Sequence, residues 1–277
     1  MSLKEALKDK LSEEELKVLR RSFEIIGNIA IIEIPDELMQ KSDLIVSAIL
    51  SRHKNVKTVL RKVGEVSGIF RVAKYEKLYG EETETIAKEF GCRFLVDPTK
   101  VYFSSKLSSE RERIARLVRE GERVLVMFAG VGPYAIVISK LSKPKEVVGV
   151  ELNSVAAEYF RRNVKLNKVS NVVVIEGDVA EVVPKLEGKF DRVLMPAPYS
   201  AQDYVHLLRG KVVEGGFVHY YTFESENCEG DLPKKVEEIF LKNGMVVRTR
   251  FMRRCGNFAP YVNRYVLDLE FIREAQL

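Results

Sequence analysis

The stretch that decides the fold is Arg123-Val124-Leu125-Val126-Met127-Phe128-Ala129-Gly130-Val131-Gly132-Pro133-Tyr134. Its first half belongs to a short apolar run over 122–127, which predicts a buried strand. Gly130 and Gly132 then precede 133–142, where the apolar spacing predicts a helix. Glycines at a turn from strand to helix let the backbone approach a ligand closely. The stretch therefore predicts a ligand-binding turn.

An acidic residue follows each of the next two predicted strands. Glu151 ends the strand 146–151, and Asp178 follows the strand 172–176. An acid about twenty residues after such a turn can accept hydrogen bonds from both hydroxyls of a ribose. The pattern fits S-adenosylmethionine and also a nicotinamide dinucleotide, because Gly130 to Ala135 matches G-x-G-x-x-A. Asp178 and the Phe-Ala-Gly-Val-Gly turn favour S-adenosylmethionine.

Strands and helices alternate regularly from residue 108 onward. A helix is predicted at 108–120, and the helices after the glycine turn are predicted at 133–142, 154–167, 179–186, 200–209 and 231–243. Strands are predicted at 122–127, 146–151, 172–176, 191–195 and 214–223, with a closing pair at 245–254 and 262–271. This alternation predicts an α/β fold with a parallel sheet. A terminal hairpin after the last helix is the usual ending of class I methyltransferase folds. We therefore expect a Rossmann-like, mostly parallel seven-stranded sheet.

The first hundred residues have a different pattern. An amphipathic helix is predicted at 3–22, a strand at 25–34 and a helix at 36–52. Shorter strands are predicted at 56–62, 69–74, 83–89 and 92–97. The chain is therefore expected to have a small α+β domain at 1–97 and a catalytic domain at 98–277.

Composition limits the class of protein. The 277 residues are 46% hydrophobic and 31% charged, which is typical of a globular chain. No apolar run approaches the length of a membrane span, and the charged segment 1–10 lacks a signal-peptide core. We expect a cytoplasmic protein. Three cysteines and three histidines are too scattered for a metal site, and His219, in an apolar run, is expected to be a core histidine.

Three segments carry a resemblance to a known family. They are Val101 to Arg111, the turn Met127 to Pro133, and Gly215-Gly216-Phe217-Val218-His219-Tyr220-Tyr221. Together they resemble the archaeal and eukaryotic type of tRNA (guanine-37-N1)-methyltransferase and its relative, the tRNA aminocarboxypropyltransferase of the wybutosine pathway. The resemblance implies transfer from S-adenosylmethionine to a base of the tRNA anticodon loop, and a monomer. It also implies that the small domain helps to hold the tRNA.

The resemblance assigns roles to individual residues. Glu110 matches the acid expected to act as general base, and Arg111 matches a cofactor contact. Arg71 resembles the arginine that helps to hold the target guanine. Guanine N1 carries a proton, so a carboxylate must remove it as the methyl group arrives, and a cation near O6 would stabilise the developing charge. The full set of expected cofactor contacts is Arg111, Phe128, Ala129, Gly130, Gly132, Glu151, Leu152, Asp178, Val179 and Pro196.

Two positions depart from the expected pattern. Many methyltransferases carry an acid at the end of the first strand, where this chain has Val126. The motif after the fourth strand often begins with asparagine, and here it reads Met195-Pro196-Ala197-Pro198-Tyr199. Proline has no side-chain or N–H donor for a base, although Tyr199 could stack on one. Aminocarboxypropyl transfer and a non-catalytic RNA-binding module therefore stay open as alternatives.

Basic and aromatic residues suggest where RNA binds. The segment 248–254 contains four arginines around Phe251, and the net charge of the chain is +5. Such a surface suits a polyanion with unpaired bases. The expected RNA contacts are Lys106, Tyr199, Arg250 and Arg253.

Overall fold

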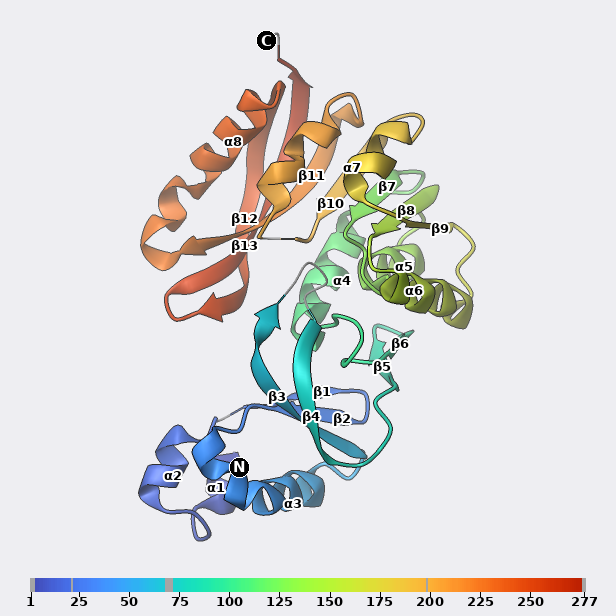
Figure 1. Ribbon diagram of the computed structural model, residues 1–277. Helices are drawn as coiled ribbons and strands as arrows, with labels where there is room; N and C mark the ends of the chain where they lie inside the picture. The colour runs from blue at the N-terminus through green and yellow to red at the C-terminus, as the bar shows by residue number, and fades with distance from the viewer. Residues whose placement is uncertain (1–2, 21, 68–71, 198, 276–277) are drawn as a thin grey trace. The chain divides into compact units, whose positions relative to one another are not determined.

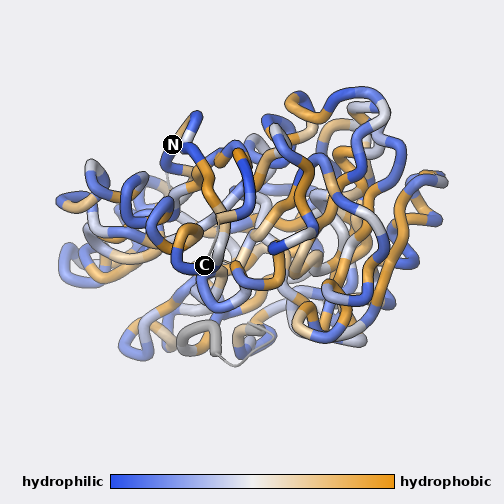
Figure 2. The backbone as a smooth tube through the Cα atoms, turned by 90° about the horizontal axis from the view of Figure 1, so that it is seen from above, coloured by the Kyte–Doolittle hydropathy of each residue, from blue (hydrophilic) through white to orange (hydrophobic). Residues whose placement is uncertain are grey.

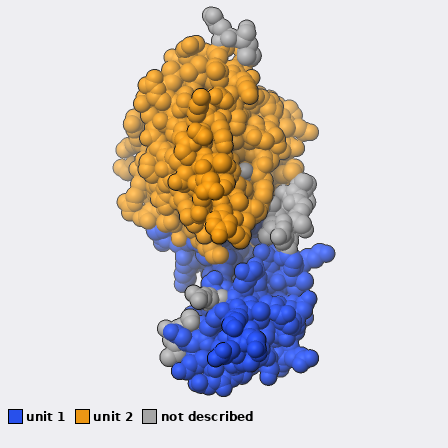
Figure 3. Space-filling model, turned by 90° about the vertical axis from the view of Figure 1, so that its left-hand side faces the viewer, with its two compact units in different colours: residues 1–105 blue, residues 106–277 orange. Residues whose placement is uncertain are grey.

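A computed structural model of the chain describes residues 3–20, 22–67, 72–197 and 199–275. The chain divides into two compact units, 1–105 and 106–277, which are coloured separately in Figure 3. The division falls eight residues after the expected boundary at 97, because the segment after β6 packs on unit 1, where the Phe103 ring lies 5.9 Å from the Phe94 ring.

Unit 1 is built on a four-stranded sheet in the order β1-β2-β3-β4 (Figure 1). Its elements are α1 (Leu3–Leu7), α2 (Glu13–Val18), β1 (Glu24–Ile26), β2 (Ile29–Ile32), η1 (Asp36–Lys41), α3 (Ser42–Arg52), β3 (Thr58–Ser67) and β4 (Val72–Tyr79). A separate hairpin contains β5 (Thr85–Glu89) and β6 (Cys92–Val96). Strands β2 and β3 are parallel and are connected through α3. Leu3, Leu7 and Leu11 are buried in the same apolar cluster as α3.

Two predictions for unit 1 are wrong. The single helix at 3–22 is two helices, because Ser12 and Glu15 form a capping box that starts α2. The single strand at 25–34 is a hairpin, because Gly27-Asn28 makes a two-residue turn between β1 and β2. Gly27 has φ +57 and lies against Thr85, so a side chain there would meet the Thr85 hydroxyl.

Unit 2 contains a seven-stranded sheet in the order β12-β13-β11-β10-β7-β8-β9. After η2 (Ser105–Leu107) its elements are α4 (Ser108–Leu117), β7 (Arg123–Met127), α5 (Pro133–Leu141), β8 (Glu146–Glu151), α6 (Ser154–Asn167), β9 (Val172–Glu176), α7 (Val179–Val182), η3 (Val183–Lys185), β10 (Phe190–Met195), η4 (Ala201–Leu208), β11 (Val212–Ser225), η5 (Glu226–Asp231), α8 (Leu232–Lys242), β12 (Met245–Ala259) and β13 (Val262–Glu274).

The strands β9, β8, β7, β10 and β11 run parallel, and only β13 and β12 are antiparallel to their neighbours. The expected mostly parallel seven-stranded sheet is confirmed. The helix predicted at 200–209 is the 3-10 helix η4.

Each face of this sheet is covered by helices, as the apolar strands require. On one face α5 contacts both α4 and α6, and on the other η4 contacts both α7 and α8 (Figure 1). Side chains of β7 alternate between the faces, so Leu125 and Met127 belong to the core under α8 while Val124 and Val126 point to the opposite side. Hydrophobic strands alternate with hydrophilic loops along the chain (Figure 2). Among the described residues, no helix has the length and apolar character that a membrane crossing needs.

The close packing of α6 against the start of α5 depends on glycine. Gly132 caps α5 with φ +86, and a β-carbon there would lie 2.0 Å from Cδ2 of the Phe160 ring. Gly149 of β8 meets the same ring, 2.4 Å from Cε1. Gly132 is therefore required for packing as well as for the turn.

We predict that Gly132→Ala destabilises the protein much more than Gly210→Ala. Gly210 also has positive φ (+74) but has no atom near the position of a β-carbon, so its variant reports the backbone cost alone. That cost is about 1–2 kcal/mol, and overpacking against Phe160 should add roughly 1–3 kcal/mol. Urea unfolding of both variants measures the difference. Equal losses would show that the contact with Phe160 does not matter.

Candidate active site

The predicted cofactor residues meet at one edge of the seven-stranded sheet. They follow the carboxyl ends of β7, β8, β9 and β10, and parallel strands bring these ends to the same edge. The chain leaves β7 toward β8 on one side, and β10 lies on the other side of β7. Such a switch point in strand order is where open α/β sheets bind ligands.

The glycine turn follows β7 directly. Phe128, Gly130 and Gly132 all have positive φ, at 57°, 59° and 86°. The N–H of Ala129 donates to the Val150 carbonyl at 2.8 Å, which ties the turn to β8. Ala129 is 5% exposed, and the Phe128 ring packs edge-on against Tyr204 at 5.1 Å between centroids. The turn therefore presents backbone rather than side chains at this edge.

Glu151 is positioned by backbone donors at the end of β8. Its Oε2 accepts from the N–H of Gly130 at 2.6 Å, and its Oε1 accepts from the N–H of Asn153 at 2.8 Å. Burial raises the pKa of Glu151, and the hydrogen bonds from Asn153 and Gly130 oppose that shift. Each carboxylate oxygen has a second lone pair, so two further donors such as ribose hydroxyls can be accepted.

The other predicted cofactor residues follow the ends of β8, β9 and β10. Asp178 caps α7 through a 2.8 Å bond from the Ala180 N–H to its Oδ1. Leu152 is 45% exposed, whereas Val179 is 4% exposed and lies in the core, so Val179 can offer a ligand little beyond its backbone. Pro196 is half-buried directly after β10.

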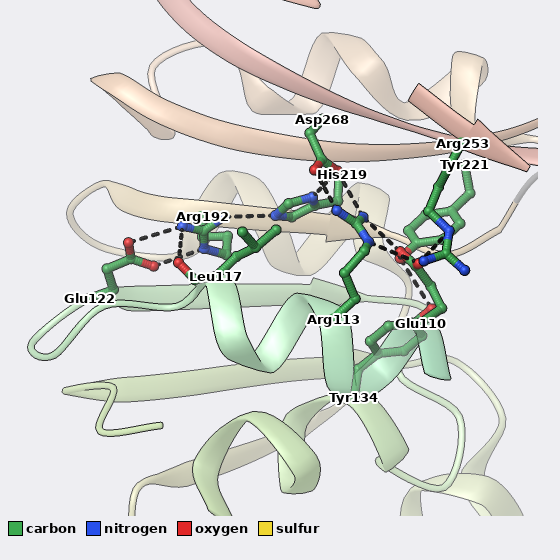
Figure 4. Close-up of polar contacts among 10 residues, drawn as sticks. All are labelled: Glu110, Arg113, Leu117, Glu122, Tyr134, Arg192, His219, Tyr221, Arg253 and Asp268. Carbon is green, nitrogen blue, oxygen red and sulfur yellow. Dashed lines mark hydrogen bonds and ion pairs between the residues drawn. The ribbon is translucent and has the colours of Figure 1, made fainter. Parts of the chain in front are cut away.

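Glu110 and Arg111 begin α4, and both are 1% exposed. Arg111 lies 6.0 Å from the centroid of the Tyr134 ring. Glu110 is held on both oxygens: Arg113 donates to Oε1 at 2.8 Å and to Oε2 at 3.0 Å, and the Tyr221 hydroxyl donates to Oε1 at 3.0 Å (Figure 4). Arg253 of β12 approaches Oε2 at 3.7 Å and is 36% exposed. Solvent therefore reaches the neighbourhood of Glu110 from the Arg253 side.

Glu110 is connected to the glycine turn through two tyrosines. Tyr134 lies in the first turn of α5, and its hydroxyl donates to the Tyr221 hydroxyl at 3.1 Å. Burial raises the pKa of both phenols, and the nearby Glu110 carboxylate adds to the shift. Both tyrosines are therefore neutral donors at neutral pH, and they hold the carboxylate beside the start of α5.

A buried chain of polar contacts continues from Glu110 across the sheet. Arg113 also donates to Asp268 at 2.6 and 3.0 Å, and Asp268 accepts from Nδ1 of His219 at 2.6 Å. The His219 Nε2 lies 2.8 Å from Nη1 of Arg192, which in turn donates to Glu122 at 2.8 and 3.0 Å (Figure 4). Because arginine only donates, Nε2 of His219 is the acceptor and its proton is on Nδ1.

The chain of contacts is balanced in charge. His219 is neutral, because burial and the nearby charges of Arg192 and Arg113 lower its pKa, although the contact with Asp268 raises it. Burial would raise the pKa of Asp268, but the hydrogen bonds from His219 and Arg113 outweigh it and hold that pKa well below its usual range. Three carboxylates then face three guanidinium groups: Glu110, Asp268 and Glu122 against Arg113, Arg192 and Arg253. The expected core histidine at position 219 is confirmed.

The structure separates the predicted RNA residues. Arg250 is ion-paired with Glu270, its Nε 2.6 Å from Oε2, whereas Arg253 reaches toward Glu110. Lys106 is exposed in η2, and Tyr199 is 52% exposed after β10. Arg71 lies outside the described residues.

Comparison with known proteins shows the family. The TRM5/TYW2 methyltransferase domain matches residues 85–247. The chain belongs to this family. The TYW2 N-terminal domain matches residues 3–83. Membership in a methyltransferase family favours S-adenosylmethionine over the nicotinamide dinucleotide that the glycine turn also fitted.

Three relatives show the range of named activities within the family. A tRNA (guanine(37)-N(1))-methyltransferase, Trm5b of Pyrococcus abyssi, is 40% identical, covering 94% of this chain and 77% of its own. A tRNA 4-demethylwyosine(37)-methyltransferase, Taw21 of Saccharolobus solfataricus, is 38% identical over 78% of this chain and 82% of its own. A tRNA(Phe) (4-demethylwyosine(37)-C(7)) aminocarboxypropyltransferase of Methanocaldococcus jannaschii is 33% identical over 91% of this chain and 98% of its own.

Two solved structures from the family are similar along most of the chain. A complex of aTrm5 with tRNALeu aligns with a TM-score of 0.85 at 33% identity, covering 99% of this chain and 78% of the other. The M. jannaschii TYW2 in complex with AdoMet aligns with a TM-score of 0.71 at 30% identity, covering 91% and 100%.

Sequence reasoning missed the partners of Glu110. Arg113 carries a local signal, since it lies three residues after Glu110 on the same helix face. Arg192 and Asp268 interrupt apolar strands, and a charged residue inside such a strand signals a buried pair. Among the described residues, no group of three or more His, Cys, Asp or Glu side chains is arranged to hold a metal.

We predict that His219 makes folding stability depend on pH. Its pKa is lowered in the folded protein, so below the unfolded value of about 6.5 only the unfolded state takes up the proton. Stability is therefore complete above that pH and falls as the pH drops, by about 1.4 kcal/mol per unit once well below it. Urea unfolding at pH 7.5 and 5.5 measures the loss. His219→Asn should abolish it, whereas His206→Asn, at an exposed histidine, should keep it. An unchanged pH dependence in His219→Asn would contradict the assignment.

Proposed function

We propose that this protein transfers a methyl group from S-adenosylmethionine to N1 of the guanine at position 37 of tRNA. The observation that carries the proposal is the placement of Glu110. Tyr221 and Tyr134 tie this carboxylate to the first turn of α5, next to the glycine turn that would hold the cofactor. A proton acceptor beside the methyl donor is what alkylation of a protonated ring nitrogen requires.

The residues at the sheet edge fit the cofactor. Glu151 has lone pairs left for the ribose hydroxyls, Asp178 follows the next strand, and the glycine turn offers open backbone between them. When bound, S-adenosylmethionine supplies an electrophilic methyl group on a sulfonium. The named family members include a structure in complex with AdoMet.

The chemistry assigned to the chain is removal of one proton and stabilisation of charge. Glu110 accepts the N1 proton of guanine while N1 bonds to the methyl carbon, and the bond from that carbon to the sulfonium would break and leave its electron pair on sulfur as a neutral thioether. Arg113 and Tyr221 bond the Glu110 carboxylate at 3.0 Å or shorter, whereas Arg253 lies 3.7 Å from Oε2, so the base reaches Oε2 by displacing Arg253. The displaced guanidinium remains beside the base, where it can neutralise the charge that develops on O6.

A second candidate is aminocarboxypropyl transfer, and one position favours it. Pro196 follows β10 where the methyltransferase pattern has an asparagine, and it has no side-chain group that could hydrogen-bond guanine. The match of 3–83 to a TYW2 N-terminal domain points in the same direction. Two of the named relatives act on 4-demethylwyosine at position 37, so that tricyclic base is the alternative acceptor.

We also propose that unit 1 contributes to holding tRNA and that the protein acts as a monomer in the cytoplasm. The support for the tRNA contact is the structure of the relative aTrm5 with tRNALeu, whereas the monomer is what the family resemblance implies. Sedimentation of the purified protein with and without tRNA tests the monomer.

We predict N1-methylguanosine and S-adenosylhomocysteine as the products. The purified protein is mixed with S-adenosylmethionine and either unmodified tRNA with guanine at position 37 or tRNA with 4-demethylwyosine there, and nucleosides and cofactor products are identified by mass spectrometry. Methylthioadenosine would establish aminocarboxypropyl transfer, and methylation only of the tricyclic base would change the acceptor. Absence of product with intact tRNA binding would leave a non-catalytic RNA module.

Glu110→Gln provides the matched variant for this assay. The amide keeps the shape of the side chain but cannot take the proton, so kcat should fall by about 10²–10⁴-fold. Cofactor affinity should not change, because Glu110 does not lie among the residues of the sheet edge. Wild-type activity in this variant would remove Glu110 from the mechanism.

We predict that Glu151→Ala weakens S-adenosylmethionine binding by roughly 10–100-fold, the loss of one or two charge-assisted hydrogen bonds. Glu176→Ala is the control, since Glu176 is the register partner of Glu151 on β9 but is exposed and pairs with Arg161. Isothermal titration calorimetry gives both constants. An equal loss of affinity in the two variants would mean that Glu151 contributes only its negative charge and makes no specific hydrogen bond to the cofactor.

A further inference from the structure

One face of the antiparallel part of the sheet continues past the first turn of α4, where Glu110 lies. Tyr221, Val266 and Arg253 lie opposite one another on β11, β13 and β12, and both Tyr221 and Arg253 reach Glu110 (Figure 4). Residues two apart in a strand share a face and lie about 7 Å apart. Phe223 and its partner Arg264 are therefore one step beyond the Glu110 contact, on the same face, past the first turn of α4.

Three aromatic rings cluster at this step. Tyr199 after β10 packs edge-on against Phe223 at 4.6 Å and against Phe258 of β12 at 5.1 Å, and Phe223 and Phe258 are 4.4 Å apart. Tyr199 is 52% exposed and Phe258 is 49% exposed, so rings that pack on one another still present their outer surfaces to solvent. We call Tyr199, Phe223 and Phe258 the aromatic cluster.

The surroundings of the aromatic cluster are positively charged. The Arg264 guanidinium lies 5.4 Å from the centroid of the Phe223 ring. Arg253 lies nearer to Glu110, whose Oε2 it approaches. Rings flanked by arginines fit a ligand that combines flat faces with negative charge.

We propose that the aromatic cluster is a stacking platform for an unpaired nucleotide next to the target base. The inference rests on the proposed function and deepens it, because it says how the protein holds the loop that contains the target. A base turned toward Glu110 leaves its neighbours unstacked, and an aromatic surface one step away replaces the lost stacking. Aromatic platforms bind every base through its π face, so this contact adds affinity for the loop without reading its sequence.

The charge distribution favours RNA over a protein partner. A second protein chain would cover apolar rings with apolar groups and would leave Arg253 and Arg264 to be desolvated. An RNA strand brings a phosphate for each base, so stacking and charge neutralisation occur together.

The test compares Phe258→Leu with Phe258→Tyr. Leucine keeps an apolar side chain but has no ring face, whereas tyrosine keeps the ring. Binding of a fluorescent anticodon stem–loop is measured by anisotropy, with RNAs that are intact or that lack the base on either side of position 37. Affinity for S-adenosylmethionine is measured in parallel and should be unchanged in both variants.

We predict that Phe258→Leu weakens binding of the intact stem–loop about 5–150-fold, the range for loss of one stacked base. Phe258→Tyr should bind like the wild type. If the missing base is the one that stacks, the wild type should bind that abasic RNA as weakly as Phe258→Leu binds the intact RNA. Phe258→Leu should then bind this abasic RNA no more weakly than it binds the intact RNA, because the amino-acid change and the missing base remove the same contact.

Two outcomes would overturn the proposal. One is intact binding by Phe258→Leu, and the other is a loss of the same size on every RNA, which would show that no particular base stacks there. A change in sedimentation of Phe258→Leu without a change in RNA affinity would identify the aromatic cluster as a contact between copies of the chain. The binding assay needs no turnover, so ring-dependent binding without a methylated product refutes the proposed chemistry but leaves the platform in place.

Discussion

The double salt bridge of Arg113 is the interaction on which the site depends. This side chain bonds Glu110 on its own helix and Asp268 on β13, with four contacts between 2.6 and 3.0 Å. It therefore fixes α4 against the antiparallel end of the sheet and sets the position of the carboxylate assigned to proton removal. The Arg113 guanidinium also lies 5.0 Å from the centroid of the Phe251 ring, so an aromatic side chain contacts it in addition to the two carboxylates. Breaking such a buried pair by removing one partner costs about 3–5 kcal/mol, because the other charge is left uncompensated.

The two ends of the reaction are held by different physical means. At the cofactor edge, backbone N–H groups of Gly130 and Asn153 orient Glu151, so the geometry follows from strand pairing and turn conformation. At the acceptor side, side chains from α4, β11, β12 and β13 orient Glu110, so the geometry follows from tertiary packing. Tyr134 connects the two, since it begins the helix after the glycine turn and bonds Tyr221.

This difference explains what could be predicted from the sequence. The alternation of strands and helices in unit 2 and the edge formed by Gly130, Glu151 and Asp178 follow from short-range periodicity and from the rule that parallel strands end together. The errors at 3–22 and 25–34 arose because apolar periodicity was followed through the Ser12 capping box and the Gly27-Asn28 turn. Glu110 was found through the family resemblance. Its partner Arg113 bonds Asp268, 155 residues away, and no local pattern specifies which charged residue of one strand meets which residue of a helix.

The charge balance of the buried chain limits how the family can diverge. Arg192 and Glu122 are 70 residues apart in the sequence, yet each neutralises the other inside the protein. A lineage that replaces Arg192 with an apolar residue leaves Glu122 charged and alone, and the reverse replacement leaves Arg192 alone. The two positions should therefore change together or stay fixed, and the same holds for Arg113 with its two acids. Homologous sequences from this family should show these residues as correlated pairs or triplets, even where they do not touch cofactor or RNA.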